Sequence, residues 1–319
     1  MTGGYTAIPS PAIDAAIDGA IAGIGAAIGA MGIPHMEGVV LGGGYGRGEG
    51  GVRRRPGLDD APCNDLDFYV VADDSSSPSD LAAIGAALEP LAAKWSRSLG
   101  VDADFSPAKT YWRMKHDEAR LMIQELIRGY RDVAGKPGTE LFAGLARRRP
   151  EETPLAEAVR LLMNRGAGLL LAKEGGRGAD FVARNINKAV LGAGDARLIA
   201  RHDYAWRIGE RAGRLSEPLY SAAAEWKAMP QGAPVCDWES ARDSWLAAEA
   251  EVRAALRGSA DGRRSLYHAA RWIVRRRTIG PAATFGLDPS LRVMLEIGRA
   301  IRAGAPFTAP MARDWRTFN

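Results

Sequence analysis

Cysteine, histidine and lysine are all scarce in this chain of 319 residues. The two cysteines, Cys63 and Cys236, are too few for a disulfide framework or a four-thiolate zinc site, and they favour a reducing compartment. The four histidines lack the paired spacing of zinc ligands. Only seven of the 42 basic residues are lysines, so arginine supplies most of the positive charge. The net charge of +4 permits an anionic substrate or RNA and requires neither.

Long hydrophobic runs are also absent. The most apolar stretch, residues 13–31, contains Asp14 and Asp18, follows no basic segment and shows no small-residue cleavage signal. No segment reaches the roughly 18 consecutive apolar residues that a membrane span needs. The sequence therefore predicts a cytoplasmic protein with no membrane partner.

Two common nucleotide-binding signatures are missing as well. No Gly-Lys-Ser or Gly-Lys-Thr triplet is present, which excludes a P-loop. Gly46, Gly48 and Gly51 have the spacing of a dinucleotide fingerprint, but they lead into Val-Arg-Arg-Arg-Pro instead of opening a helix. This argues against a Rossmann site.

The first half of the chain mixes helix and strand signals. Isoleucines spaced by three or four residues predict a helix over 11–31, and Leu81 to Leu99 is helical in the same way. Short apolar runs predict strands at 38–42, 66–71 and 101–105. Residues 46–63, which are rich in glycine, proline and arginine, are expected to form a loop.

After about residue 150 the pattern of apolar residues changes, and the alternation typical of strands is almost absent. Helical periods dominate six segments: 152–174, 179–200, 203–228, 238–257, 262–277 and 288–303. Pro150 marks the boundary, because proline tends to end or start a helix. We therefore expect an α+β domain over residues 1–150, with a small mixed sheet and flanking helices, and an all-α helical bundle over residues 151–319.

Two polar features flank the 46–63 loop. The first is a strand that runs into a glycine-rich turn, where Gly43 and Gly44 allow backbone amides to approach an anion closely. The second is the strand that carries Asp65 and Asp67, whose side chains face the same side because they are two residues apart. Paired carboxylates repel each other unless a cation lies between them, and Mg²⁺ is commonly held by one or two carboxylates plus substrate phosphates. Together these features suit phosphoryl or nucleotidyl transfer.

A third acidic position comes from the strand at 101–105. Asp102 and Asp104 share one face of it, and one of them could bind a second metal or take the proton from an attacking hydroxyl. The residues alone do not choose between the two.

The segment Gly43–Glu49, followed by Asp65-Leu66-Asp67, resembles the DNA polymerase β-type nucleotidyltransferase superfamily. The sequence of Gly43–Glu49 is especially similar to that of PII-protein uridylyltransferases. The predicted strand at 101–105 resembles a strand of aminoglycoside nucleotidyltransferases. The resemblance covers about residues 36–135. It implies that Asp65, Asp67 and Asp102 hold metal, that Asp102 acts as the base, and that Gly43 and Gly44 bind the nucleotide.

One departure from that pattern is the twenty residues, 45–64, between Gly44 and Asp65, which are more than the family usually places there. This insertion could close over the triphosphate, and it could equally mark a repurposed site. Within the turn, the Arg47 guanidinium could grip phosphates or pair with Glu49 or Asp67. Lys188, on the polar face of the 179–200 helix, is a further candidate for the triphosphate.

These observations predict an enzyme that uses Mg²⁺, with two ions possible, to transfer a nucleoside monophosphate from a nucleoside triphosphate to a hydroxyl group, releasing pyrophosphate. A small-molecule acceptor is expected, because no RNA-binding module is visible, and a protein acceptor comes next. The alternatives are an RNA-directed (tRNA) nucleotidyltransferase and a catalytically inactive nucleotide-binding or interaction protein.

Overall fold

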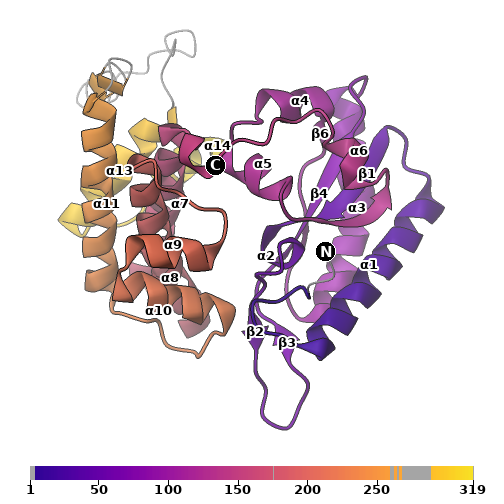
Figure 1. Ribbon diagram of the computed structural model, residues 1–319, viewed down its shortest axis with the longest axis horizontal. Helices are drawn as coiled ribbons and strands as arrows, with labels where there is room; N and C mark the ends of the chain where they lie inside the picture. Colours follow the sequence, from indigo (N-terminus) through magenta and orange to yellow (C-terminus); the bar gives the residue numbers. More distant parts are fainter. Residues whose placement is uncertain (1–3, 175, 259–261, 264–265, 268–288, 319) are drawn as a thin grey trace. The chain divides into compact units, whose positions relative to one another are not determined.

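The computed structural model describes residues 4–174, 176–258, 262–263, 266–267 and 289–318. The chain divides into two compact units, one made of Met1–Arg148 with Lys227–Pro230, the other of Arg149–Trp226 with Gln231–Asn319. Figure 1 labels the elements of both. Each unit is described below by itself.

The first unit is built around a small mixed sheet. Its strands are β1 (Met36–Leu41), β4 (Leu66–Ala72), β5 (Ala103–Phe105), β6 (Lys109–Thr110) and β7 (Arg131–Gly135). The order is β5-β4-β1-β7, with β6 also pairing with β4. Strand β1 is antiparallel to both neighbours, whereas β5 and β6 are parallel to β4. The expectation of a small mixed sheet with flanking helices is confirmed.

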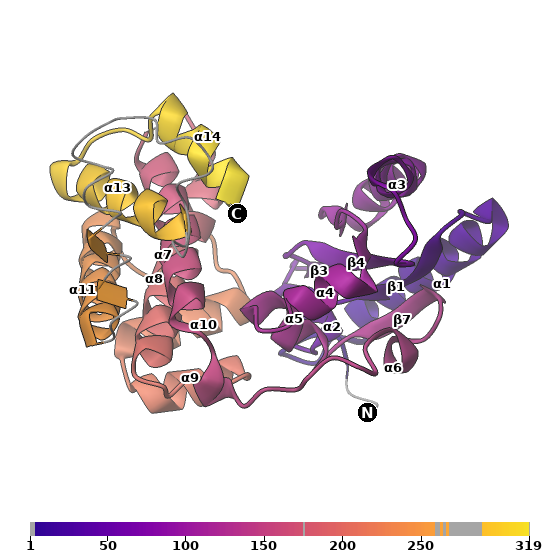
Figure 2. The same cartoon turned by 90° about the horizontal axis from the view of Figure 1, so that it is seen from above.

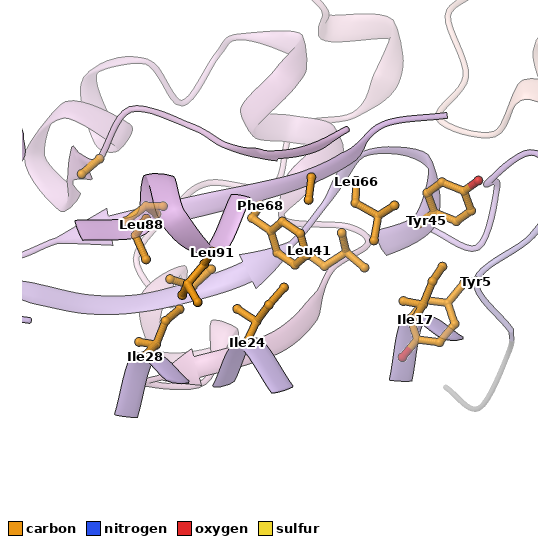
Figure 3. Close-up of a cluster of buried hydrophobic side chains, with 14 of the residues drawn as sticks. Tyr5, Ile17, Ile24, Ile28, Leu41, Tyr45, Leu66, Phe68, Leu88 and Leu91 are labelled. Carbon is orange, nitrogen blue, oxygen red and sulfur yellow. The ribbon is translucent and has the colours of Figure 1, made fainter. Parts of the chain in front are cut away.

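Two long helices cover one face of this sheet. Helix α1 (Pro11–Met31) begins with a proline, whose fixed φ suits the first helical turn, and ends at Gly32 in the left-handed region. Helix α3 (Pro78–Leu99) begins with a reciprocal capping box between Ser77 and Asp80. Their apolar side chains meet those of the strands in one buried cluster, part of which Figure 3 shows: Ile17, Ile24, Ile28, Leu41, Leu66, Phe68, Leu88 and Leu91.

Three short helices lie on the opposite face: α4 (Tyr111–His116), α5 (Leu121–Leu126) and α6 (Gly138–Leu141). Val40 and Val71 of the sheet pack there against a second buried cluster, which includes Met114, Ile123, Leu126 and Leu141. Because successive strand residues face opposite sides, the two clusters divide each strand's side chains between them.

The expected loop at 46–63 contains a small element of its own. Strands β2 (Val52–Arg53) and β3 (Ala61–Pro62) form a two-stranded antiparallel ribbon. The exposed turn between them is held by an ion pair of Arg54 with Asp60 and by a hydrogen bond of 2.8 Å from Arg55 Nε to the Asp59 carbonyl. The arginines of this turn therefore have partners within the turn.

Helix α1 bears on the expectation that no segment could span a membrane. Within the described residues, it is the one helix that is long and apolar enough to do so by length and composition alone. Core helices of soluble proteins and signal sequences meet the same criterion. One face of α1 packs on the sheet through Ile13, Ile17, Ile24 and Ile28.

Within its described residues, the second unit contains helices and no strand. It includes a short 3-10 turn η1 (Pro150–Glu152) and the helices α7 (Leu155–Lys173), α8 (Ala179–Ala200), α9 (Ile208–Leu215), α10 (Pro218–Ala228), α11 (Trp238–Gly258), α13 (Pro289–Ala303) and α14 (Ala309–Phe318). Figure 2 shows α7, α8, α11 and α13 packed together. Trp245 lies fully buried among them, donating from Nε1 to the Leu162 carbonyl at 3.0 Å.

One helix predicted for this half differs from the structure, and another lies mostly outside the described residues. The single helix predicted over 203–228 is two helices, α9 and α10, because Ser216 takes a left-handed conformation with φ of 53° and ends the first. Most of the predicted helix at 262–277 lies outside the described residues.

Candidate functional site

The site begins with the pairing of β4 and β5. Their parallel register places Asp67 directly beside Asp104. A hydrogen bond of 2.8 Å from the Leu66 amide to the Asp102 carbonyl fixes one end of this pairing, and another of 2.8 Å from the Ser106 amide to the Phe68 carbonyl fixes the other. Cβ atoms of side-by-side strand residues lie roughly 5 Å apart, so the two carboxylates share one small region of the sheet.

Stacked aromatic rings hold the same register from the opposite face. Phe68 and Phe105 flank Asp67 and Asp104 in sequence, and their ring centroids lie 4.9 Å apart with an interplanar angle of 18°. Phe68 is buried in the cluster under α1 and α3. Since strand side chains alternate, Asp67 and Asp104 face the other side, which α4 and α5 cover in part.

The glycine turn lies against Asp67. It forms a one-turn helix, α2 (Gly43–Gly46), directly after β1, and the Gly42 amide donates to the Asp67 carbonyl at 2.8 Å. Gly43 has φ of 59°, and a Cβ atom added to it would lie 2.0 Å from Asp67 Oδ2. Gly43 is therefore required twice, once for its backbone conformation and once because the Asp67 carboxylate occupies the space of a side chain.

Gly44 differs from its neighbour. A Cβ atom added to Gly44 would lie 3.5 Å from the Glu49 carbonyl oxygen, an ordinary van der Waals distance, and its φ is not positive. The two glycines named together in the sequence thus have different local constraints, and of the two it is at Gly43 that a side chain would collide with Asp67.

Asp65 and Asp102 complete the acidic group. The pKa of Asp104 is raised above its ordinary value, first by partial burial and then by the negative charges of Asp65 and Asp102. Asp65 and Asp102 therefore lie close enough to Asp104 for their negative charge to oppose its ionisation. Such repulsion is what a cation relieves.

The donor set fits a Mg²⁺ ion that is shared with a substrate. Within the described residues, no three side chains of His, Cys, Asp or Glu converge closely enough to hold a metal by themselves. Mg²⁺ seldom uses an all-protein cage and is usually bound by one or two carboxylates plus substrate phosphates. Asp65 and Asp67 supply that number of oxygen ligands, and the absence of a side chain at Gly43 gives the Asp67 carboxylate room against the turn.

The structure distinguishes between the two later acids. Asp104, and not Asp102, is the register neighbour of Asp67. Asp102 precedes β5, where its carbonyl group accepts the Leu66 amide. This favours Asp104 as the third acid, although the sequence resemblance points to Asp102.

Arg47 forms ion pairs with two carboxylates of the chain. Its Nε lies 3.3 Å from Glu49 Oε2, and its Nη1 lies 3.1 Å from Glu125 Oε2, with the Arg47 side chain 12% exposed. Of the two roles that the sequence left open, these contacts correspond to the pairing with Glu49. Glu125, on α5, was not singled out in the sequence, because nothing local indicates that α5 packs beside the turn.

Two tyrosines near the acidic residues also went unnoticed in the sequence. Tyr69 follows Asp67 on the same face of β4, and its pKa is raised by burial and by the charges of Asp67 and Glu125. Tyr45 lies within the turn and is 1% exposed. Both are ordinary apolar positions by pattern, so only the structure reveals the hydroxyl partners of Tyr45 and the charges near Tyr69.

Lys188 belongs to the second unit, near the middle of α8, where its side chain is half-buried. The acidic group described above is built within residues 42–125 and does not include it.

Comparisons of the chain with models of protein families, with curated proteins and with solved structures found no match.

Proposed function

We propose that the chain is a Mg²⁺-dependent nucleotidyltransferase that moves a nucleoside monophosphate from a nucleoside triphosphate to an acceptor hydroxyl. The observation that carries the proposal is the position of Asp67, which lies between the glycine turn at Gly43 and its register neighbour Asp104. Paired carboxylates beside a glycine turn suit this chemistry, because the carboxylates can hold Mg²⁺ and the turn lets backbone amides approach phosphate closely.

Each acidic residue has a role in the proposal. Asp65 and Asp67 hold the Mg²⁺ ion, which when bound neutralises phosphate charge and orients the triphosphate. The turn at Gly43 and Gly44 brings backbone close to the phosphates. Asp104 acts as the general base, and its raised pKa suits this role, because a base works best when its pKa approaches the working pH.

The reaction is an in-line displacement. The acceptor oxygen forms a bond to the α-phosphorus, the bond from that phosphorus to the bridging oxygen breaks, and pyrophosphate leaves. The hydroxyl proton passes to the Asp104 carboxylate. The chain contributes mainly position and charge, since phosphoryl chemistry depends chiefly on these two effects.

A small molecule with a free hydroxyl group is the proposed acceptor. The net charge of +4 on 319 residues is modest for a chain that must hold RNA through its backbone. A protein acceptor and an RNA acceptor are distinguished from it by the test below.

The test incubates the purified chain with each α-labelled nucleoside triphosphate, Mg²⁺ and a cell extract, and follows where the label goes. Label in the small-molecule fraction supports the proposal, whereas label in protein or RNA supports the enzyme class and changes the acceptor. Asp67→Asn should lower the transfer at least about 100-fold. Asp59→Asn, in the exposed β2–β3 turn, is the matched control and should leave it unchanged. Equal labelling by wild type and Asp67→Asn would overturn the proposal.

A further inference from the structure

The Tyr45 hydroxyl connects three separate parts of the first unit. It donates to the Gly51 carbonyl at 2.8 Å, and it accepts from the backbone amides of Cys63 at 3.0 Å and Asn64 at 3.5 Å. Tyr45 itself belongs to the glycine turn, Gly51 precedes β2, and Asn64 precedes Asp65. One buried oxygen thus joins the turn beside Asp67 to the residues that lead into Asp65.

The packing around the ring is closely fitted. A Cβ atom on Gly50 would lie 2.1 Å from Tyr45 Cδ1, and one on Gly51 would lie 2.4 Å from Cys63 Sγ. Glycines at both positions allow the chain to pass over the ring. Figure 3 shows Tyr45 beside the apolar cluster with its hydroxyl pointing away from it.

These contacts close the base of the long segment between the turn and the acidic strand. Residues 46–62 leave the turn, form the β2–β3 ribbon and return at Cys63, so that Tyr45 meets Cys63 across 18 positions of sequence. Cys63, Asn64 and Asp65 lie between β3 and β4 and outside any strand. The conformation of Asp65 is consequently not set by the sheet ladder and depends on side-chain ties such as this one.

We propose that Tyr45 is a positioning residue, whose hydroxyl holds the Cys63–Asn64 backbone so that Asp65 faces the same cation as Asp67. This inference rests on the proposed function, because it assumes that Asp65 and Asp67 share Mg²⁺. It also gives a role to the longer segment 45–64: the insertion is anchored at its two ends, and the acidic pair keeps its geometry.

Tyr45→Phe removes the hydroxyl and keeps the ring. Groups that orient a metal ligand typically change metal affinity by 10–100-fold, and we expect roughly a 10-fold weakening here. The measurement is Mn²⁺ binding to the full chain by electron paramagnetic resonance, in the presence of a non-hydrolysable nucleoside triphosphate analogue. Tyr220→Phe is the matched control, since that hydroxyl also makes buried hydrogen bonds, to Asp195 and Arg211, but in the second unit.

The outcomes separate this inference from the function on which it rests. Weaker Mn²⁺ binding in Tyr45→Phe and Asp65→Asn, with wild-type binding in Tyr220→Phe, supports it. Weaker binding in Asp65→Asn with wild-type binding in Tyr45→Phe overturns the inference and leaves the proposed function standing. Binding that is equal in all four proteins overturns both.

A second measurement guards against simple misfolding of Tyr45→Phe. If the hydroxyl only positions a ligand, saturating Mn²⁺ should restore nucleotidyl transfer in Tyr45→Phe and leave Asp67→Asn inactive. Activity that stays low at every Mn²⁺ concentration, with thermal unfolding at a reduced temperature, would show that the hydroxyl serves the fold and would overturn the positioning role.

Discussion

Asp67 of β4 and Asp104 of β5 are neighbours in a parallel register, and Asp67 also lies against Gly43, where no side chain has room. The acidic pair is thus fixed by backbone pairing on one side and by a glycine turn on the other. The first constraint belongs to the sheet and the second to the short helix α2, which follows β1 directly.

The two glycines of the turn should respond differently to substitution. Gly43→Ala introduces a methyl group where Asp67 Oδ2 lies and strains a backbone with φ of 59°. A residue forced into that conformation costs about 1–3 kcal/mol. We expect Gly43→Ala to lower both thermal stability and nucleotidyl transfer.

Gly44→Ala is the matched control, because its methyl group would meet only ordinary contacts. It should keep both stability and activity close to wild type. If thermal unfolding and the labelled-nucleotide assay showed equal effects of the two substitutions, the contact between Gly43 and Asp67 would not have the importance assigned to it.

Replacing Asp104 with asparagine should raise the stability of the chain and lower its activity. Because its pKa in the folded chain is raised, ionisation of Asp104 destabilises the fold, and this loss develops as pH rises through the folded pKa. Asp104→Asn should therefore raise the unfolding temperature at neutral pH, by roughly 1–2 °C without divalent cations. Because Asp104 is the proposed general base, Asp104→Asn should also lower the rate of nucleotidyl transfer by roughly 100-fold or more.

The measurements are differential scanning fluorimetry at acid and neutral pH, and the transfer assay. The gain in unfolding temperature should shrink at acid pH, where Asp104 is protonated in the wild type. A gain that is the same at both pH values would contradict the electrostatic explanation.

Lys109 of β6 is a second site where charge opposes folding. Its pKa is lowered, first by burial, with the charges of Arg113 and Arg120 adding to this and Asp117 opposing it. A lowered lysine pKa means that stability is lost as pH falls through the folded value. Lys109→Met keeps the apolar stem and removes the charge, so it should stabilise the chain, by about 2–4 °C for each kcal/mol gained.

Lys115→Met provides the comparison for Lys109. The Lys115 ammonium is more exposed, lies 2.8 Å from Glu118 and donates to the Gly144 carbonyl at 2.9 Å. Its loss should not raise the unfolding temperature. Stabilisation by Lys115→Met but not by Lys109→Met would refute the explanation.

In the second unit, removing Glu249 of α11 should cost less stability than removing its two arginine partners. Its carboxylate is 1% exposed and pairs with Arg253 and Arg302, which are 34% and 44% exposed. Removing both arginines leaves a buried charge without these partners, at a cost of about 3–5 kcal/mol, whereas the arginines left by Glu249→Gln can reach water. The double variant Arg253→Met/Arg302→Met should thus unfold at lower denaturant concentration than Glu249→Gln. The reverse order would contradict this interpretation.

The parts of the fold that follow from local pattern were predictable. The isoleucine spacing predicts α1 because one face of that helix packs on the sheet, and the alternation of Leu66 and Phe68 with the acids predicts β4 because it separates core from site. The same alternation places Asp67 on β4 as predicted, but the prediction that this strand also carries Asp65 is wrong, because β4 begins one residue later, at Leu66.

What could not be predicted depends on pairing between distant segments. The pairing of Asp67 with Asp104, and not with Asp102, follows from the register of β4 against β5, which neither strand specifies alone. Glu125 beside Arg47 and the Tyr45 hydroxyl beside Cys63 are likewise tertiary contacts. The strands β6 and β2 are only two residues long, too short for a period to be visible.

The most direct test of the central claim is the position of the cation. Crystals of the chain grown with Mn²⁺ and a non-hydrolysable nucleoside triphosphate analogue would locate it by anomalous scattering. The account predicts a peak between the Asp65 and Asp67 carboxylates, with the triphosphate beside Gly43. A peak at other residues, or a bound nucleotide away from the glycine turn, would contradict it.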